Sequence, residues 1–182
     1  QPFLSAYVVQ GMLDVQRAGL PVDTTSLNRG LGFLTQYLGR PVDVGSPDDV
    51  NTRAFMLLVL AEAGRPNTGL ASALFERRAA LSDYGRGYLL HAFTLASGGR
   101  LDSRAQTLLT ELATHASWSA TGAHWSEPAP SFRTFGGPSR STAVVLAALL
   151  AAEPTSPLID PAVRWLMAER RSGWWSTSYE IG

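Results

Sequence analysis

Three segments of this chain are apolar on nearly every face of a helix, and they alternate with segments that are apolar on one side only. The fully apolar segments cover residues 54–61, 88–96 and 143–152. A helix that is apolar all round is enclosed by other helices, whereas a one-sided stripe marks a helix at the edge of a core. Residues 24–38 show such a stripe, with leucines at spacings of three and four. The alternation predicts an inner layer of buried helices and an outer layer of amphipathic ones.

Residues that end and begin helices punctuate the chain. Glycines, several of them followed by proline, close the apolar stretches, since glycine adopts the left-handed backbone that ends a helix. Asp23, Ser46 and Asp102 stand where a side chain caps a helix N-terminus. No segment alternates polar and apolar residues over a useful length, so no strand is predicted, and residues 119–138 are expected to form an irregular loop. The pattern predicts about eight helices, over residues 4–18, 24–38, 48–63, 69–81, 83–97, 103–117, 139–153 and 161–171.

Alternating helices of this kind predict an all-α fold of stacked helical hairpins. Such a stack either stays open as a solenoid or curves into an alpha/alpha toroid of concentric helices. Tyr7, Phe55, Tyr88 and Ala143 mark the inner helices, and they lie 48, 33 and 55 residues apart. Because this spacing is too uneven for a short strict repeat, we favour the toroid.

Composition excludes several functional classes. The chain has 182 residues, enough for one domain, and its fifteen basic and fifteen acidic residues cancel. A net charge of zero gives no electrostatic footprint for nucleic acid or anionic lipid, so neither is expected as a partner. With no cysteine, the chain forms no disulfide, thiolate metal site or thiol nucleophile. The longest apolar run, Ala143–Ala152, is far shorter than the ~20 residues that cross a bilayer, so no membrane insertion is expected.

Two groups of helical toroids share motifs with this sequence. Residues 162–177 (AVRWLMAERRSGWWST) resemble a repeat of terpene cyclases, although the glutamine of that repeat is absent. More of the chain resembles the thioester-containing domain of bacterial alpha-2-macroglobulins. The matching segments follow the family's order and extend over essentially all of the chain: LSAYVVQGMLDVQRAGLPVDTTSLNRGLGFLTQYL (4–38), RAFMLLVLAEAGRP (53–66), LFERRAALSDYGRGYLLHAF (74–93), RAQTLLTEL (104–112) and STAVVLAALLAAEPTSPLIDPAVRWLMAERRSGWWST (141–177).

The resemblance implies a fold and a place in a longer chain. The fold is an alpha/alpha toroid of helical hairpins, terpenoid cyclase/prenyltransferase-like and incomplete. Residues 1–182 are expected to be a single domain, the C-terminal part of the thioester-type helical domain, within a fragment of a much larger protein. A segment of a toroid is expected to expose apolar surface where its first hairpins are missing, and therefore to self-associate.

The resemblance also implies a broad-spectrum endopeptidase inhibitor of the bacterial periplasm or cell envelope. In this family a protease cleaves a bait region, and the inhibitor then rearranges and traps it. Many members carry a Cys-x-Glu-Gln thioester, upstream of the position that matches residues 4–7, which acylates the attacking protease. Since this segment has no cysteine, it cannot form the thioester by itself. The expected partners are the other domains of the parent inhibitor and, through the parent, target proteases.

No catalytic, cofactor-binding or metal-binding residue is predicted, and we expect no catalysis by this segment. His91 lies among apolar residues and is predicted to be a core histidine. His115 and His124 are nine residues apart, which is not the i, i+4 spacing of helical zinc ligands. The segment Gly136–Arg140 lacks the lysine of a phosphate loop and is predicted to be a turn that begins a helix.

Two other classes of protein stay open as alternatives, a toroid-fold enzyme fragment (terpene cyclase or glycosidase type) and a helical-repeat binding module. A glycosidase needs two carboxylates around a cleft. The loop carboxylates available for this role are Asp43, Asp48, Asp49, Glu127 and Glu180. Asp48 and Asp49 are better explained as favourable charges at a helix N-terminus.

Ring-bearing residues near loops are candidate interface residues. Trp165 falls on a predicted helix and is expected to lie in the core. The others flank loops, where a ring either plugs the end of a helical layer or anchors a partner. The candidate interface residues are Trp118, His124, Trp125, Trp174 and Trp175.

Overall fold

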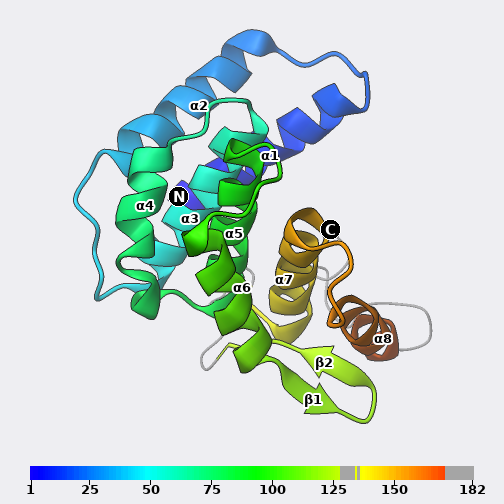
Figure 1. The fold of residues 1–182 in the computed structure, drawn as a ribbon. Coiled ribbons are helices and arrows are strands. Elements are labelled where there is room, and N and C mark those ends of the chain that lie inside the picture. The colour runs from blue at the N-terminus through cyan, green and yellow to red at the C-terminus, as the bar shows by residue number, and fades with distance from the viewer. Residues whose placement is uncertain (128–133, 135, 171–182) are drawn as a thin grey trace.

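Helices of two kinds alternate along the chain, and the structure packs them in two layers (Figure 1). The computed structural model describes residues 1–127, 134 and 136–170. Helices α1, α3, α5 and α7 lie side by side in this order, and α2, α4, α6 and α8 pack against them. The helices are α1 (Pro2–Arg17), α2 (Thr24–Leu38), α3 (Pro47–Glu62), α4 (Thr68–Phe75), α5 (Asp83–Ala96), α6 (Ser103–His115), α7 (Pro138–Ala152) and α8 (Ile159–Glu169).

The all-α prediction is confirmed, and the ends of most predicted helices lie within two residues of the observed ones. The predicted helix 69–81 is the exception, because it divides into α4 and the 3₁₀-helix η1 (Arg78–Ala80). A tighter 3₁₀ turn is a common way for the end of an α-helix to continue. None of the described helices combines the length and the hydropathy needed to cross a bilayer.

Local side-chain chemistry explains where the helices begin. The Asp23 carboxylate accepts hydrogen bonds from the backbone N–H groups of Thr25 and Ser26 at the start of α2. The Ser46 hydroxyl accepts one from the backbone N–H of Asp49 at the start of α3. These bonds satisfy N–H groups that have no partner within the helix. The caps are therefore as the sequence predicts.

Two glycines let α5 fit between α3 and α7. A Cβ atom at Gly85 would overlap the side-chain amide of Asn51 on α3. A Cβ at Gly87 would lie 3.3 Å from a methyl group of Val144 and 3.4 Å from the Cα atom of Val145, both on α7. Both contacts are tight, and the second involves backbone, which cannot move aside without shifting the helix. The close packing of the inner layer thus depends on glycine at these positions.

Aromatic rings from successive inner helices contact one another across the core. The Phe3 ring on α1 lies 5.2 Å from the Phe55 ring on α3, and Phe55 lies 4.8 Å from the Tyr88 ring on α5. Tyr84 completes the series with an edge-on contact to Tyr88 at 6.1 Å. Burial raises the pKa of Tyr88 to about 12, so its hydroxyl stays protonated. The rings join three inner helices through apolar contact.

The enclosure predicted for the inner helices is correct for α3 and wrong for α7. Every residue of α3 from Val50 to Leu60 is buried. On α7, by contrast, Ala143, Ala147 and Leu150 are exposed. The reason is position, since α7 is the last inner helix described and has an inner neighbour, α5, on one side only.

The absence of strands predicted from the sequence is also wrong. Strand β1 (Ser117–Ser119) pairs antiparallel with β2 (Gly122–His124), and the predicted helix 103–117 ends at His115 to make room for this hairpin. The strands are too short to produce a pattern of period two. Contacts with another element stabilise them instead, because β2 packs closely on α8, where a Cβ atom at Gly122 would overlap the backbone of Pro161.

Candidate functional site

The β1–β2 hairpin carries two of the candidate interface residues. Trp118 lies in the middle of β1, with 63% of its surface exposed. His124, at the end of β2, is half-buried and stacks on the Trp165 ring of α8, with centroids 4.6 Å apart and planes 10° apart. The Nδ1 atom of His124 is buried and has no hydrogen-bond partner among the described residues. Trp165 lies in the core as predicted, and the Trp118 ring is exposed on the surface.

Trp125 packs inside the molecule and offers no surface. Its side chain is completely buried, with 0% exposed. The indole Nε1 donates a hydrogen bond to the carbonyl oxygen of Leu112 on α6 over 2.8 Å, and the backbone N–H donates to Oγ1 of Thr142 on α7 over 3.1 Å. These bonds join the end of α6 to α7. The remaining candidates, Trp174 and Trp175, lie outside the described residues.

Helix α1 has two apolar faces, of which one is exposed. The buried face packs on α2 and α3 through Phe3, Ala6, Val9 and Leu13. The other face carries an exposed apolar row, which consists of Leu4, Tyr7, Val8 and Val15. Val8 alone is 59% exposed, and no charged residue occurs on α1 before Asp14. A row of large, uncharged side chains is typical of a surface that is buried in a contact with another element or protein.

Apolar side chains are exposed at the opposite end of the inner layer as well. Leu150 on α7 is 49% exposed, and Met167 on α8 is 54% exposed, one helical turn beyond the exposed Val163. The inner layer therefore has apolar surface at both ends, on α1 and on α7 with α8. These two surfaces, together with Trp118, are the candidate interface of the described residues.

The carboxylate of Asp49 is committed to holding the loop between α2 and α3. Its Oδ2 accepts a hydrogen bond from Nε of the buried Arg53 over 2.7 Å, and its Oδ1 accepts one from the Tyr37 hydroxyl over 2.7 Å. Burial and this bond to Asp49 raise the pKa of Tyr37. The remaining donors of Arg53 bind the backbone carbonyls of Leu38, Arg40 and Pro41. The Asp43 backbone N–H also donates to Asp49, which ties the loop to the start of α3.

Glu127 is likewise committed to structure, at the start of α7. Its Oε1 accepts hydrogen bonds from the Gly137 backbone N–H, from Arg140 Nη2 at 2.8 Å and from the Ser141 hydroxyl at 2.6 Å. The guanidinium of Arg140 lies over the Tyr84 ring, 3.7 Å from its centroid. Since a carboxylate of this chain already binds the N–H group of Gly137, the Gly136–Arg140 segment acts as the turn predicted from the sequence.

The histidines are dispersed over the fold. His91, predicted to be a core residue, is half-buried on α5, so that prediction is corrected. Helix α5 is oriented so that Leu90 and Ala92 lie inside the core and His91 lies at its margin, which explains the partial exposure of His91. Burial, together with the positive charge of Arg17, lowers the pKa of His91.

His115 ends α6 and contacts the Asp83 carboxylate through Nδ1 at 2.7 Å. No group of three metal-binding side chains occurs in the part of the chain that the structure describes.

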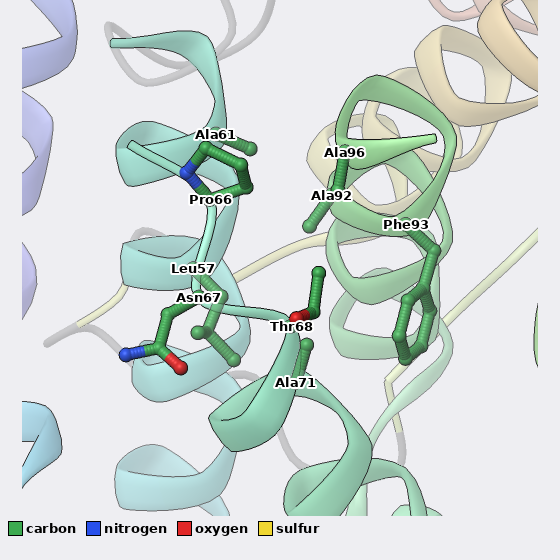
Figure 2. Close-up of a pocket in the computed structure, with 9 residues that line it drawn as sticks. All are labelled: Leu57, Ala61, Pro66, Asn67, Thr68, Ala71, Ala92, Phe93 and Ala96. Carbon is green, nitrogen blue, oxygen red and sulfur yellow. The ribbon is translucent and has the colours of Figure 1, made fainter. Parts of the chain in front are cut away.

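A small pocket between α3, α4 and α5 is too small for a ligand. Its lining is mostly apolar, with Leu57 and Ala61 on one side and Ala92 and Phe93 on the other (Figure 2). The cavity has a volume of about 10 Å³. That is about the space of one water molecule, whereas ligand pockets enclose ~300–1,000 Å³. The cavity is a small gap left where the outer helix α4 packs against the inner helices α3 and α5.

Two larger hollows are open grooves beside the start of α3. One, of about 320 Å³, is lined by polar and apolar residues that include Asp48, Asp49 and Tyr37. The other, of about 440 Å³, borders Asp83, Arg86 and Glu127. Asp83 and Glu127 are ion-paired with Arg86 and Arg140 respectively, and Asp49 is paired with Arg53. Of the loop carboxylates named above, Glu180 lies outside the described residues.

The same arrangement of helices occurs in solved structures of much larger proteins. Alpha-2-macroglobulin from Salmonella, reacted with methylamine, matches 99% of this chain with a TM-score of 0.77 and 20% sequence identity. Trypsin-activated alpha-2-macroglobulin from Escherichia coli matches 98% of it with a TM-score of 0.73 and 19% identity. This chain has a fold found within bacterial alpha-2-macroglobulins. The resemblance inferred from the sequence is thereby confirmed for the fold.

The matched region is a small part of each alpha-2-macroglobulin. It covers 12% of the Salmonella chain and 12% of the trypsin-activated Escherichia coli chain. In a native Escherichia coli alpha-2-macroglobulin that spans domain MG7 to the C-terminus, it covers 28%. No protein-family model matches the sequence, and no curated protein matches it either.

Proposed function

We propose that this chain is a structural segment of a bacterial alpha-2-macroglobulin-like protease trap. Residues 1–182 form one unit, the C-terminal part of a thioester-type helical domain, and they catalyse no reaction themselves. The observation that carries the proposal is the match of 98–99% of the chain to alpha-2-macroglobulins, at TM-scores of 0.73 to 0.77. The parent would act in the periplasm or cell envelope, where it meets foreign proteases.

The interior supports a scaffolding role. The inner helices fill their shared core with leucine, alanine and aromatic side chains. A toroid-fold enzyme needs carboxylates that face a deep cleft and are free to move protons. Here Asp49 and Glu127 are engaged by arginines and by backbone or hydroxyl donors, at the starts of α3 and α7. We therefore prefer the scaffold to the terpene cyclase or glycosidase alternative.

The exposed apolar surfaces at the two ends of the inner layer suit a piece of a larger helical domain. We assign the row on α1 (Leu4, Tyr7, Val8 and Val15) and the surface of α7 and α8 to contacts with further helices of the parent. Such contacts would complete an alpha/alpha toroid. They would also hold the segment in a fixed position relative to the other domains of the inhibitor.

The covalent step, where the parent has one, lies outside this segment. A thioester is a strained acyl donor that is kept dry until bait cleavage exposes it. A nucleophile on the protease, such as a lysine amine, then attacks the thioester carbonyl carbon, and the cysteine leaves as a thiolate. Because this chain has no cysteine, its part is to support the domain that carries the thioester.

The sequence of the parent chain upstream of Gln1 tests this proposal. A Cys-x-Glu-Gln motif within about one domain length would make the segment part of a covalent trap. Methylamine should then release one thiol per molecule of intact parent, measured with a thiol reagent, and a Cys-to-Ala variant of that motif should release none. Bait-type and helical sequence without the cysteine would indicate a non-covalent trap. A start codon close to Gln1 would overturn the proposal and favour the binding-module or enzyme alternative.

A further inference from the structure

We draw no further inference here: the strongest candidate, the exposed Trp118 ring on the β1–β2 hairpin beside α8, is an unpartnered apolar surface, and nothing in the structure shows what covers it.

Discussion

The indole Nε1 of Trp125 donates a hydrogen bond to the carbonyl oxygen of Leu112 over 2.8 Å, and both groups are buried. Leu112 belongs to the last turn of α6, where carbonyl groups have no partner within the helix. Trp125 thus caps α6 from a residue that follows the hairpin. Its backbone N–H also donates a hydrogen bond to Oγ1 of Thr142 on α7, so this one residue links α6 to α7.

Replacement of Trp125 by phenylalanine is expected to destabilise the fold by about 1–3 kcal/mol, because the Leu112 carbonyl loses its buried partner. Urea unfolding, followed by circular dichroism, measures this change. Trp118→Phe is the matched control, because the Trp118 ring is exposed. A surface substitution of this kind changes the free energy of unfolding by no more than about 0.5 kcal/mol. Equal stability losses in the two variants would contradict the assignment of Trp125 to the core.

Arg53→Ala is expected to be among the most destabilising arginine substitutions. It removes the partner of the Asp49 carboxylate and three backbone hydrogen bonds in a buried site, which costs about 3–5 kcal/mol. Arg17→Ala provides the control, because Arg17 is half exposed and its ion pairs are worth about 0–1 kcal/mol. Chemical denaturation of both variants gives the comparison. A loss at Arg53 no larger than that at Arg17 would show that the loop between α2 and α3 does not depend on this arginine.

Replacement by alanine is expected to change the stability of the fold in opposite directions at Gly87, which is closely packed, and at Gly32, which has open space around it. Gly87→Ala places a methyl group against the backbone of α7 and should cost about 1–3 kcal/mol. Gly32→Ala, within α2 and with open space around its Cα, should instead stabilise by about 0.5–1 kcal/mol through helix propensity. Thermal unfolding of the two variants distinguishes these signs. A stabilising Gly87→Ala would mean that α5 and α7 pack less closely than the structure shows.

Stability should fall in mild acid because of His91. Burial lowers the pKa of His91 in the folded chain below the ordinary value of 6.5. Below pH 6.5 the unfolded chain therefore binds a proton at this residue more readily than the folded chain does, and protonation favours unfolding. The neutral, buried His91 therefore costs no stability above pH 6.5, and the free energy of unfolding falls as the pH decreases below that value.

His91→Gln tests this pH dependence, since glutamine does not titrate. Urea midpoints measured at pH 7.5 and pH 5.0 should differ less in His91→Gln than in the wild-type chain. His115→Gln serves as the second comparison, because His115 is more exposed and contacts Asp83. If wild type and His91→Gln lose stability equally between the two pH values, burial of His91 has no role in the acid response.

The exposed row on α1 should make the isolated chain self-associate. Leu4, Tyr7, Val8 and Val15 leave apolar side chains exposed along one helix, and exposed apolar surface of this kind favours association. A Tyr7→Ser/Val8→Ser variant should shift the monomer–oligomer equilibrium, measured by sedimentation equilibrium, towards the monomer. Leu20→Ser/Val44→Ser is the matched control, because these residues are equally exposed but lie in loops. A wild-type chain that stays monomeric at high concentration would count against the model of a truncated toroid.

Local signals explain why the helices could be predicted. The starts of α2 and α3 depend on Asp23 and Ser46, which act on N–H groups two or three residues away. Interactions of such short range are visible in sequence. The enclosure of α3 was predictable for residues 54–60, because no polar residue occurs there to face water. The burial of Asn51, Thr52 and Arg53 in the same helix was not predicted from the sequence.

Contacts between distant segments explain what the sequence did not reveal. The β1–β2 hairpin has strands of only three residues each, and it is stable because Gly122 and His124 pack against Pro161 and Trp165 of α8. The burial of Trp125 depends on Leu112 and Thr142, residues that precede it by 13 and follow it by 17 positions. The exposure of Leu150 depends on which helices flank α7, and the apolar sequence of α7 does not show which neighbours it has.

A protease challenge of the intact parent protein tests the central claim most directly. The parent is incubated in excess with trypsin, and the remaining activity is measured on a large substrate, casein, and on a small peptide amide. A trap encloses the protease without blocking its active site, so casein cleavage should fall several-fold while cleavage of the small amide persists. Trypsin incubated with albumin is the control. Full activity on both substrates, or equal loss on both, would contradict a role for this chain in a protease trap.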